Sequence, residues 1–258
     1  MSPEAPPDPL DFRPRVALAS LSGEADADWA RAGSEYAGAA FLGGIALDEP
    51  TREAARELVD RDRTEFLPAD PVGFVDEQLA ALADSPVQAG FNVRTTELEP
   101  LHEVGAVCRD RGAILEINAH CRQDEMCAAG AGEVLLRDAD RLSELVAAAA
   151  ETGATVSVKV RAEVPGVDLP AVARRIESAG GDAIHVDAMD SEPVVGDVAA
   201  AADLFVIANN EVRDERSVRE YLEYGADAVS VGRPSDEPAV LDRVRDATEA
   251  WFAGEVEP

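Results

Sequence analysis

Four ionisable side chains stand in three β-rich runs of the chain. Lys159 lies in Val-Ser-Val-Lys-Val-Arg, Glu116 in Leu-Glu-Ile-Asn, and His185 and Asp187 in Ile-His-Val-Asp. Lys159 is the only lysine in the sequence, and arginine takes every other Lys or Arg position. An amine among carboxylates can attack a carbonyl group or hold positive charge against an anionic ligand. These residue types make Lys159 the first candidate for an active-site residue.

Side chains alternate across a β-strand, so each run divides into two faces. Val156, Val158 and Val160 form an apolar face that should meet helices. The side chains left on the inner face are Glu116, Asn118, Ser157, Lys159, Arg161, His185 and Asp187. Burial of an unpaired amine is unfavourable, so we expect a carboxylate or an anionic ligand near Lys159. A structural ion network is the alternative, although arginine would suit that role better than lysine.

Eight β-rich runs alternate with Ala- and Glu-rich segments of helical length. The runs cover residues 16–20, 39–42, 87–92, 113–118, 155–161, 182–187, 204–209 and 226–231, and the clearest helical segments cover 97–109, 139–151, 169–179, 215–224 and 238–252. This order predicts an α/β fold, a (β/α)8 TIM barrel, whose strands end at the chemical site. An open doubly wound sheet is the alternative, but no Gly-x-Gly-x-x-Gly follows the first run.

The barrel accounts for most of the chain. We expect residues 1–14, rich in Pro and Asp, to form a flexible tail and residues 15–258 to form one barrel domain. The segment 48–83 is long for one connection, which predicts extra helix or loop above the barrel mouth.

The composition predicts a cytoplasmic protein of a halophile. The formal net charge is −29, and the 52 acidic residues are spread along the chain, as expected for a surface adapted to high salt. At molar salt the Debye length is about 3 Å, so this charge argues only mildly against RNA binding. Cys108, Cys121 and Cys127 fit reduced thiols, and no run approaches the ~20 apolar residues of a membrane span. A homo-oligomer is compatible with these features.

A metal site, a Schiff-base enzyme and a non-catalytic binding barrel are the alternatives. His120, Cys121 and Cys127 match no usual zinc spacing, so we predict no metal. A Schiff-base lyase or aldolase remains open, because a lone barrel lysine such as Lys159 can serve as its nucleophile. A barrel without chemistry that binds a phosphorylated metabolite through the loops at Asn209 and Gly232 is the non-enzymatic alternative.

The segment from about Ala113 to Pro234 resembles the tRNA-dihydrouridine synthases, which are flavoenzymes on a (β/α)8 barrel. Asn118-Ala119-His120-Cys121-Arg122 is similar to their Asn-x-Gly-Cys-Pro motif, and Lys159-Val160-Arg161 to their Lys-x-Arg strand. Ile207-Ala208-Asn209-Asn210 resembles their Ile-Gly-Asn-Gly turn, and Val231-Gly232-Arg233 their closing Gly-Arg. No single motif is specific, so the resemblance depends on their order and spacing.

The resemblance implies FMN as cofactor and NAD(P)H as its reductant. Cys121 would donate a proton to a pyrimidine ring carbon as hydride arrives from reduced flavin, and Lys159 would favour the anionic reduced form. The implied cofactor-binding residues are Ser20, Gln88, Asn118, Lys159, Arg161, His185, Asp187, Asn209, Asn210, Gly232 and Arg233. Among them, the loops at Asn209 and Gly232 would hold the phosphate.

Two motifs depart from the family pattern. Asp187 stands where the family has a flavin-contacting histidine, while His185 lies two residues earlier on the same face, roughly 7 Å deeper. Such an aspartate would repel an anionic ring unless Lys159 or Arg161 neutralised it. The family's Gly-Cys-Pro is His-Cys-Arg at residues 120–122, which removes a tight turn. Either the loop is reshaped for another substrate, or Cys121 no longer acts as the acid.

The sequence therefore predicts an FMN-dependent oxidoreductase resembling tRNA-dihydrouridine synthase. It would reduce the C5–C6 double bond of a uridine-like or other pyrimidine substrate, with Cys121 and Lys159 as catalytic residues. The expected partner is a pyrimidine-containing substrate, either tRNA or a small molecule.

Overall fold

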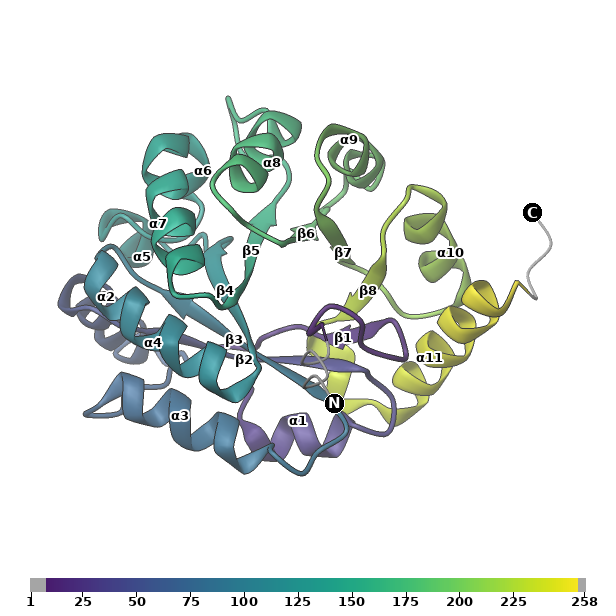
Figure 1. Ribbon diagram of the computed structural model, residues 1–258, viewed down its shortest axis with the longest axis horizontal. Coiled ribbons are helices and arrows are strands. Elements are labelled where there is room, and N and C mark those ends of the chain that lie inside the picture. The colour runs from purple at the N-terminus through teal and green to yellow at the C-terminus, as the bar shows by residue number, and fades with distance from the viewer. Residues whose placement is uncertain (1–7, 255–258) are drawn as a thin grey trace, which may run out of the picture.

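The computed structural model describes residues 8–254 and shows a closed barrel of parallel strands inside a ring of helices (Figure 1). Each strand pairs with the next in chain order, and β8 pairs with β1. The strands are β1 (Val16–Leu18), β2 (Ala39–Ala46), β3 (Gln88–Arg94), β4 (Ile114–Ala119), β5 (Thr155–Arg161), β6 (Ala183–Asp187), β7 (Phe205–Asn209) and β8 (Ala228–Val231). The predicted (β/α)8 barrel is confirmed, and closure between β8 and β1 excludes the open sheet.

The helices follow the strands as predicted. They are α1 (Ala27–Gly33), α2 (Glu49–Val59), α3 (Pro71–Ala81), α4 (Leu98–Arg111), α5 (Asp124–Ala128), α6 (Val134–Arg137), α7 (Ala139–Glu151), α8 (Leu169–Ser178), α9 (Val194–Ala201), α10 (Glu215–Glu223), the 3-10 helix η1 (Arg233–Asp236) and α11 (Pro238–Ala253). Several begin at an aspartate whose carboxylate accepts a backbone N–H of the first turn, as Asp168 does from Ala171 at 3.0 Å. Such a cap stabilises a helix by about 1 kcal/mol.

The long connection after β2 contains two helices. α3 packs against α4 in the outer ring, whereas α2 packs against α5 in the loop after β4. An ion pair between Arg61 and Glu125 joins the same two regions. The expected extra helix is confirmed, and it supports the loop that carries Cys121.

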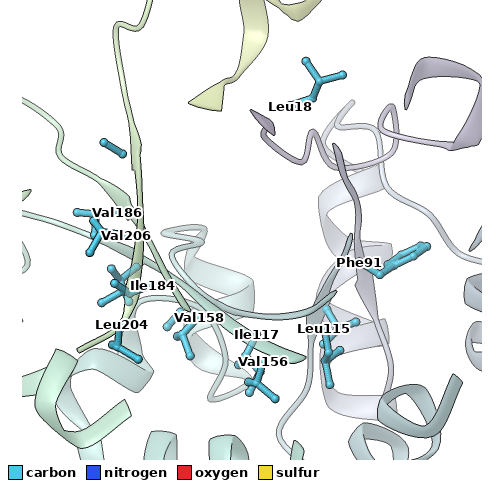
Figure 2. Close-up of a cluster of buried hydrophobic side chains, with 14 of the residues drawn as sticks. Leu18, Phe91, Leu115, Ile117, Val156, Val158, Ile184, Val186, Leu204 and Val206 are labelled. Atoms are coloured by element: carbon cyan, nitrogen blue, oxygen red, sulfur yellow. The ribbon is translucent and has the colours of Figure 1, made fainter. Parts of the chain in front are cut away.

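Apolar side chains on the outer faces of the strands form the main core. Figure 2 shows part of this layer, and its labelled members include Leu115, Ile117, Val156, Val158, Ile184 and Val186, all at most 1% exposed. Burial of one such side chain stabilises the fold by about 1.5–3 kcal/mol. The alternation that sends these residues outward turns the intervening polar residues into the barrel.

The floor of the barrel is apolar. Phe12 is buried in a cluster with Ala17, Phe41, Ile114 and other inward-facing side chains. The structure describes residues 8–14 of the predicted tail. Among them, Phe12 belongs to the core because its ring fills the amino-terminal end of the barrel. Residues 1–7 of that tail lie outside the described part. Within residues 8–254, no helix combines the length and apolar character needed to span a bilayer.

Candidate active site

A layer of polar side chains crosses the barrel above this floor. Glu116 is fully buried and accepts hydrogen bonds from Asn92 Nδ2 at 2.7 Å and from His185 Nδ1 at 2.8 Å. His185 Nε2 lies 2.7 Å from Ser230 Oγ, which accepts from Asn209 Nδ2 at 2.8 Å. An ionised carboxylate can only accept, so this order assigns the Nδ1–H tautomer to His185. The network ties five strands together and fixes the inner end of Asn209.

The Glu116–His185 pair is an ionised carboxylate with a neutral imidazole. Burial alone would raise the pKa of Glu116, but contact with His185 and the charge of Lys159 hold it below its ordinary value. Burial lowers the pKa of His185, and the charge of Glu116 opposes that effect only in part. The lowered pKa of Glu116 and the lowered pKa of His185 both favour an ionised carboxylate beside a neutral imidazole, so the pair carries one negative charge.

Lys159 lies beside this network, on the strand between those of Glu116 and His185. Its position on β5 is paired with Asn118 on β4 and with His185 on β6. The residue is 4% exposed, yet its amine makes no hydrogen bond or ion pair with any residue in the range 8–254. Burial lowers the pKa of Lys159, whereas the charges of Glu116 and Asp187 raise it. An enclosed amine without a direct partner is available to a ligand.

A cavity of about 400 Å³ opens over Lys159 at the carboxyl ends of the strands. It brings together seven of the predicted cofactor-binding residues, namely Ser20, Lys159, Asp187, Asn209, Asn210, Gly232 and Arg233. Asn209 and Gly232 belong to the ends of β7 and β8, where barrels commonly hold phosphate. A larger hollow of about 710 Å³ lies outside α10 and contains no predicted site residue.

The cavity also contains a residue that the sequence reasoning did not assign to the cofactor site. His120 lines the cavity, and its Nε2 lies 2.5 Å from Asp187 Oδ2. Asp187 also accepts the backbone N–H of Met189 at 3.2 Å. Burial would raise the pKa of Asp187, but the bond to His120 and the charge of Lys159 hold it lower. His120 stood out in the sequence as a candidate zinc ligand and as part of the altered His-Cys-Arg motif, and neither role predicts a contact with Asp187.

Asn118 organises the loop that carries Cys121. Its Oδ1 accepts the backbone N–H groups of His120 at 3.1 Å and Cys121 at 2.9 Å. A Cβ built on Gly132 would lie 2.2 Å from the Cys121 carbonyl oxygen, so only glycine permits this close approach. Cys121 packs beside Met126 and is not among the residues that line the cavity. The structure therefore places Cys121 outside the cavity lining, against α2 and α5.

Two buried arginines stand near the mouth without lining the cavity. Arg161, predicted to bind the cofactor, pairs with Glu133 at 2.8 Å. Arg94, which the sequence reasoning missed, pairs with Glu65 at 2.7 Å, and both side chains are 3% exposed. Their charges are neutralised by these carboxylates, so Lys159 is the buried cation that faces the cavity.

Gln88 does not reach this site. Its Nε2 donates to the carbonyls of Ala89 at 3.0 Å and Gly112 at 2.8 Å, at the amino-terminal end of the barrel. The predicted cofactor contact of Gln88 is corrected, because this residue begins β3 and the mouth lies at the other end of that strand. Asn92 is on the same inner face, two strand repeats higher, and joins the Glu116 network. The alternation of side chains along β3 predicts which face of the strand Gln88 occupies, but not how far along the barrel axis the residue lies.

No metal centre is formed by the described side chains. Within residues 8–254, no group of three or more His, Cys, Asp or Glu residues is arranged to hold a metal ion. His120 is instead engaged with Asp187, and Cys127 Sγ lies 3.6 Å from the Cys121 carbonyl oxygen.

Comparison with known proteins relates the chain, rather than the site itself, to a described family. Residues 91–255 match the family model described as dihydrouridine synthase (Dus). An uncharacterized protein of Methanocaldococcus jannaschii is 26% identical over 231 residues, which are 85% of this chain and 88% of that protein. The tRNA-dihydrouridine synthase B of Xanthomonas campestris pv. campestris is 26% identical over 165 residues, 58% of this chain and 50% of its own length. The chain thus matches half of that enzyme.

Solved structures with low identity share the fold. FabK from Thermotoga maritima superposes with a TM-score of 0.57 at 17% identity, over 87% of this chain and 60% of its own. A tryptophan synthase chain from Pyrococcus furiosus gives a TM-score of 0.57 at 13% identity, over 94% of this chain and 99% of its own. These likenesses concern the barrel alone.

Proposed function

Because the chain belongs to the dihydrouridine synthase family, a family of flavin-dependent oxidoreductases, we propose that it binds FMN at the barrel mouth and reduces the C5–C6 double bond of a pyrimidine. The proposed substrate is uridine within an RNA such as tRNA, and NAD(P)H is the proposed reductant. The chain matches 50% of the length of tRNA-dihydrouridine synthase B, so the substrate is not taken from that enzyme. The proposal of an RNA substrate is based on family membership and on the surface of this chain.

The amine of Lys159 is the observation that carries this proposal. It faces the cavity, is 4% exposed and has no hydrogen-bonding or ion-pairing partner among residues 8–254. Enclosing an ammonium group without a partner is unfavourable, so such a group favours an anionic ligand. A structural ion network would have paired it directly, as Arg161 is paired with Glu133 at 2.8 Å.

The remaining cavity residues fit FMN. The volume of about 400 Å³ falls within the range of small-molecule sites. A Cβ built on Gly232 would meet no atom within 4 Å, so the β8 loop leaves open space beside its backbone. Arg233 lines the same space and makes no ion pair with any described residue. Gly232, Arg233 and Asn209 would hold the phosphate, and Lys159 would face the ring.

Each catalytic residue has a limited task. FMN, when bound, supplies the hydride. Cys121 would hold the proton on Sγ and give it to the pyrimidine carbon that hydride does not reach, which completes reduction of the double bond. Asn118 fixes the Cys121 backbone, and Lys159 holds positive charge toward the cavity.

An exposed arginine supports an RNA substrate. Arg122 follows Cys121 in the loop after β4, at the barrel mouth. It makes no ion pair with a residue in the range 8–254, although the chain carries a formal net charge of −29. Arginine without a carboxylate partner is suited to a phosphate backbone.

The proposal is tested with protein purified in molar salt. It should retain FMN through gel filtration and oxidise NAD(P)H faster when an unmodified tRNA transcript is added, with a gain of two hydrogens on a uridine by mass spectrometry. Free uridine serves as the comparison substrate. Protein that retains no FMN, but is trapped at Lys159 by borohydride with a carbonyl substrate, would establish the Schiff-base alternative instead.

A further inference from the structure

The charges around Lys159 do not balance. Glu116 is paired with Ser157 and Asp187 with Arg161, so the two carboxylates lie one strand repeat below and one above Lys159, and both raise its pKa. Arg161 adds no free charge because it is paired with Glu133 at 2.8 Å. One ammonium group thus faces two carboxylates, which leaves a net negative charge at the place where an anionic ligand is proposed to bind.

Each carboxylate is hydrogen-bonded to a histidine, and the two histidines differ in their exposure to solvent. His185 is fully buried, and both of its ring nitrogens are engaged, with Glu116 and with Ser230. The His120 side chain is 31% exposed, and only Nε2 is engaged, with Asp187 at 2.5 Å. Among residues 8–254, His120 Nδ1 has no hydrogen-bond partner. A proton from solvent can therefore be added at His120 without breaking an existing bond.

We propose that His120 is the proton acceptor of this cavity, and that it takes up one proton at Nδ1 when negative charge enters beside Lys159. Asp187 is its positioning residue, since its carboxylate holds the Nε2–H. This inference rests on the proposed function for the identity of the ligand, FMN. Reduction by two electrons and one proton would leave one negative charge in the cavity, and a second proton, on His120 Nδ1, would balance it. The ammonium group of Lys159 and the imidazolium of His120 then face two carboxylates and the ligand's charge.

Other charged groups around His120 are accounted for by their own contacts. The charges that act on His120 are those of Asp187, Lys159 and Arg161, the last with its partner Glu133, and His120 in turn acts on His185. Cys121 follows it in the chain, and Glu211, Arg213 and Arg233 line the same cavity. Glu211 and Arg213 pair with each other at 3.0 Å. Burial lowers the pKa of His120 and the bond to Asp187 opposes this, so the ring is neutral and able to accept a proton before the ligand is charged.

The first experiment uses the protein without flavin. The ring signals of the three histidines are followed by NMR between pH 5 and 9 and assigned with His102→Gln, His120→Gln and His185→Gln. His120 should titrate while His185 stays neutral, and Asp187→Asn should lower the pKa of His120 by about one unit or more. Protonation of His185 before His120, or a His120 titration unchanged by Asp187→Asn, would overturn the proposal.

The second experiment measures the midpoint potential of bound FMN against pH. Each proton coupled to a two-electron reduction changes the equilibrium tenfold per pH unit, or about 30 mV. Where His120 is neutral before reduction, wild type should show about 60 mV per pH unit and His120→Gln about 30 mV. His102→Gln is the matched control, because His102 lies on α4 with its side chain 45% exposed and should keep the wild-type slope. Equal slopes in wild type and His120→Gln would refute the inference.

Failure of the proposed function is distinguishable from failure of this inference. If the protein does not retain FMN, the flavin proposal fails, and the NMR titration still decides whether His120 is the proton acceptor of the cavity. If FMN binds but His120→Gln leaves the slope unchanged, the flavin proposal stands and the role of His120 is refuted.

Discussion

Asn118 and Cys121 are joined by a 2.9 Å hydrogen bond, in which the backbone N–H of Cys121 donates to the side-chain oxygen of Asn118. The other end of the Asn118 amide donates to Asn92 at 2.8 Å, and Asn92 donates to Glu116 at 2.7 Å. The loop that carries Cys121 and His120 is therefore coupled to the fully buried network of the barrel. The position of the proposed acid depends on side chains in the barrel interior.

Asn118→Ala should loosen this loop. Loss of two accepted backbone hydrogen bonds, each worth about 1 kcal/mol, should lower uridine reduction roughly tenfold to a hundredfold and speed alkylation of Cys121 by iodoacetamide. Peptide mass spectrometry measures the alkylation at each cysteine, with buried Cys108 as internal reference. Unchanged alkylation of Cys121 would show that other contacts hold the loop.

Lys159→Met should weaken FMN binding by about a hundredfold, or roughly 2.7 kcal/mol. The change leaves Glu116 and Asp187 without the ammonium group that faces them, so an anionic ligand meets uncompensated negative charge. Fluorescence titration of FMN measures the affinity, and a thermal melt confirms that the variant folds. Lys159→Arg keeps the charge and should lose less affinity than Lys159→Met. Equal losses of FMN affinity in the two variants would show that the shape of the lysine side chain matters, rather than its charge.

Cys121→Ala should leave FMN bound while lowering pyrimidine reduction by about a hundredfold to ten-thousandfold, because no group then donates the proton. Cys127→Ala is the matched control, since it removes a thiol six residues away whose contact is with the Cys121 carbonyl oxygen at 3.6 Å. Single-turnover oxidation of reduced FMN by the RNA substrate measures the step. Full activity in Cys121→Ala would remove this residue from the mechanism.

Glu116→Gln should change how stability depends on pH. The pKa of Glu116 in the folded protein is below its ordinary value, so the folded state favours the carboxylate and the unfolded state binds the proton more readily. The stabilisation is fully present above the unfolded pKa of about 4.3 and is lost as pH falls through the folded pKa. Urea unfolding of wild type and variant from pH 3 to 7 should show a free-energy difference that shrinks on the acid side. A constant difference would contradict this prediction.

Gln88→Ala should leave FMN affinity unchanged, in contrast to the role that its position in the sequence suggested. Its hydrogen bond to the Gly112 carbonyl links the start of β3 to the residues before β4, so the variant should lose about 0.5–1.5 kcal/mol of stability. Urea unfolding and FMN titration measure the two effects separately. A clear loss of FMN affinity without a loss of stability would return Gln88 to the site.

Much of the site was accessible from the sequence because a β-strand sends alternate residues to opposite sides. The period of two predicted that Glu116, Lys159 and Asp187 face inward, and the βα order predicted a closed barrel. The loops after β7 and β8 were likewise expected at the mouth because a parallel barrel gathers all strand ends on one side. These inferences need only local geometry and connectivity.

Tertiary structure decided the heights and partners of these residues. Lys159 stands beside Asn118 and His185, and Arg161 beside Asp187, because the strands pair in one particular register. Hydrogen-bond register is set by packing of the whole barrel, so the position of Gln88 at the floor could not be deduced from its own strand. The contact between His120 and Asp187 joins residues 67 positions apart, and only closure of the fold brings the β4 loop to the end of β6.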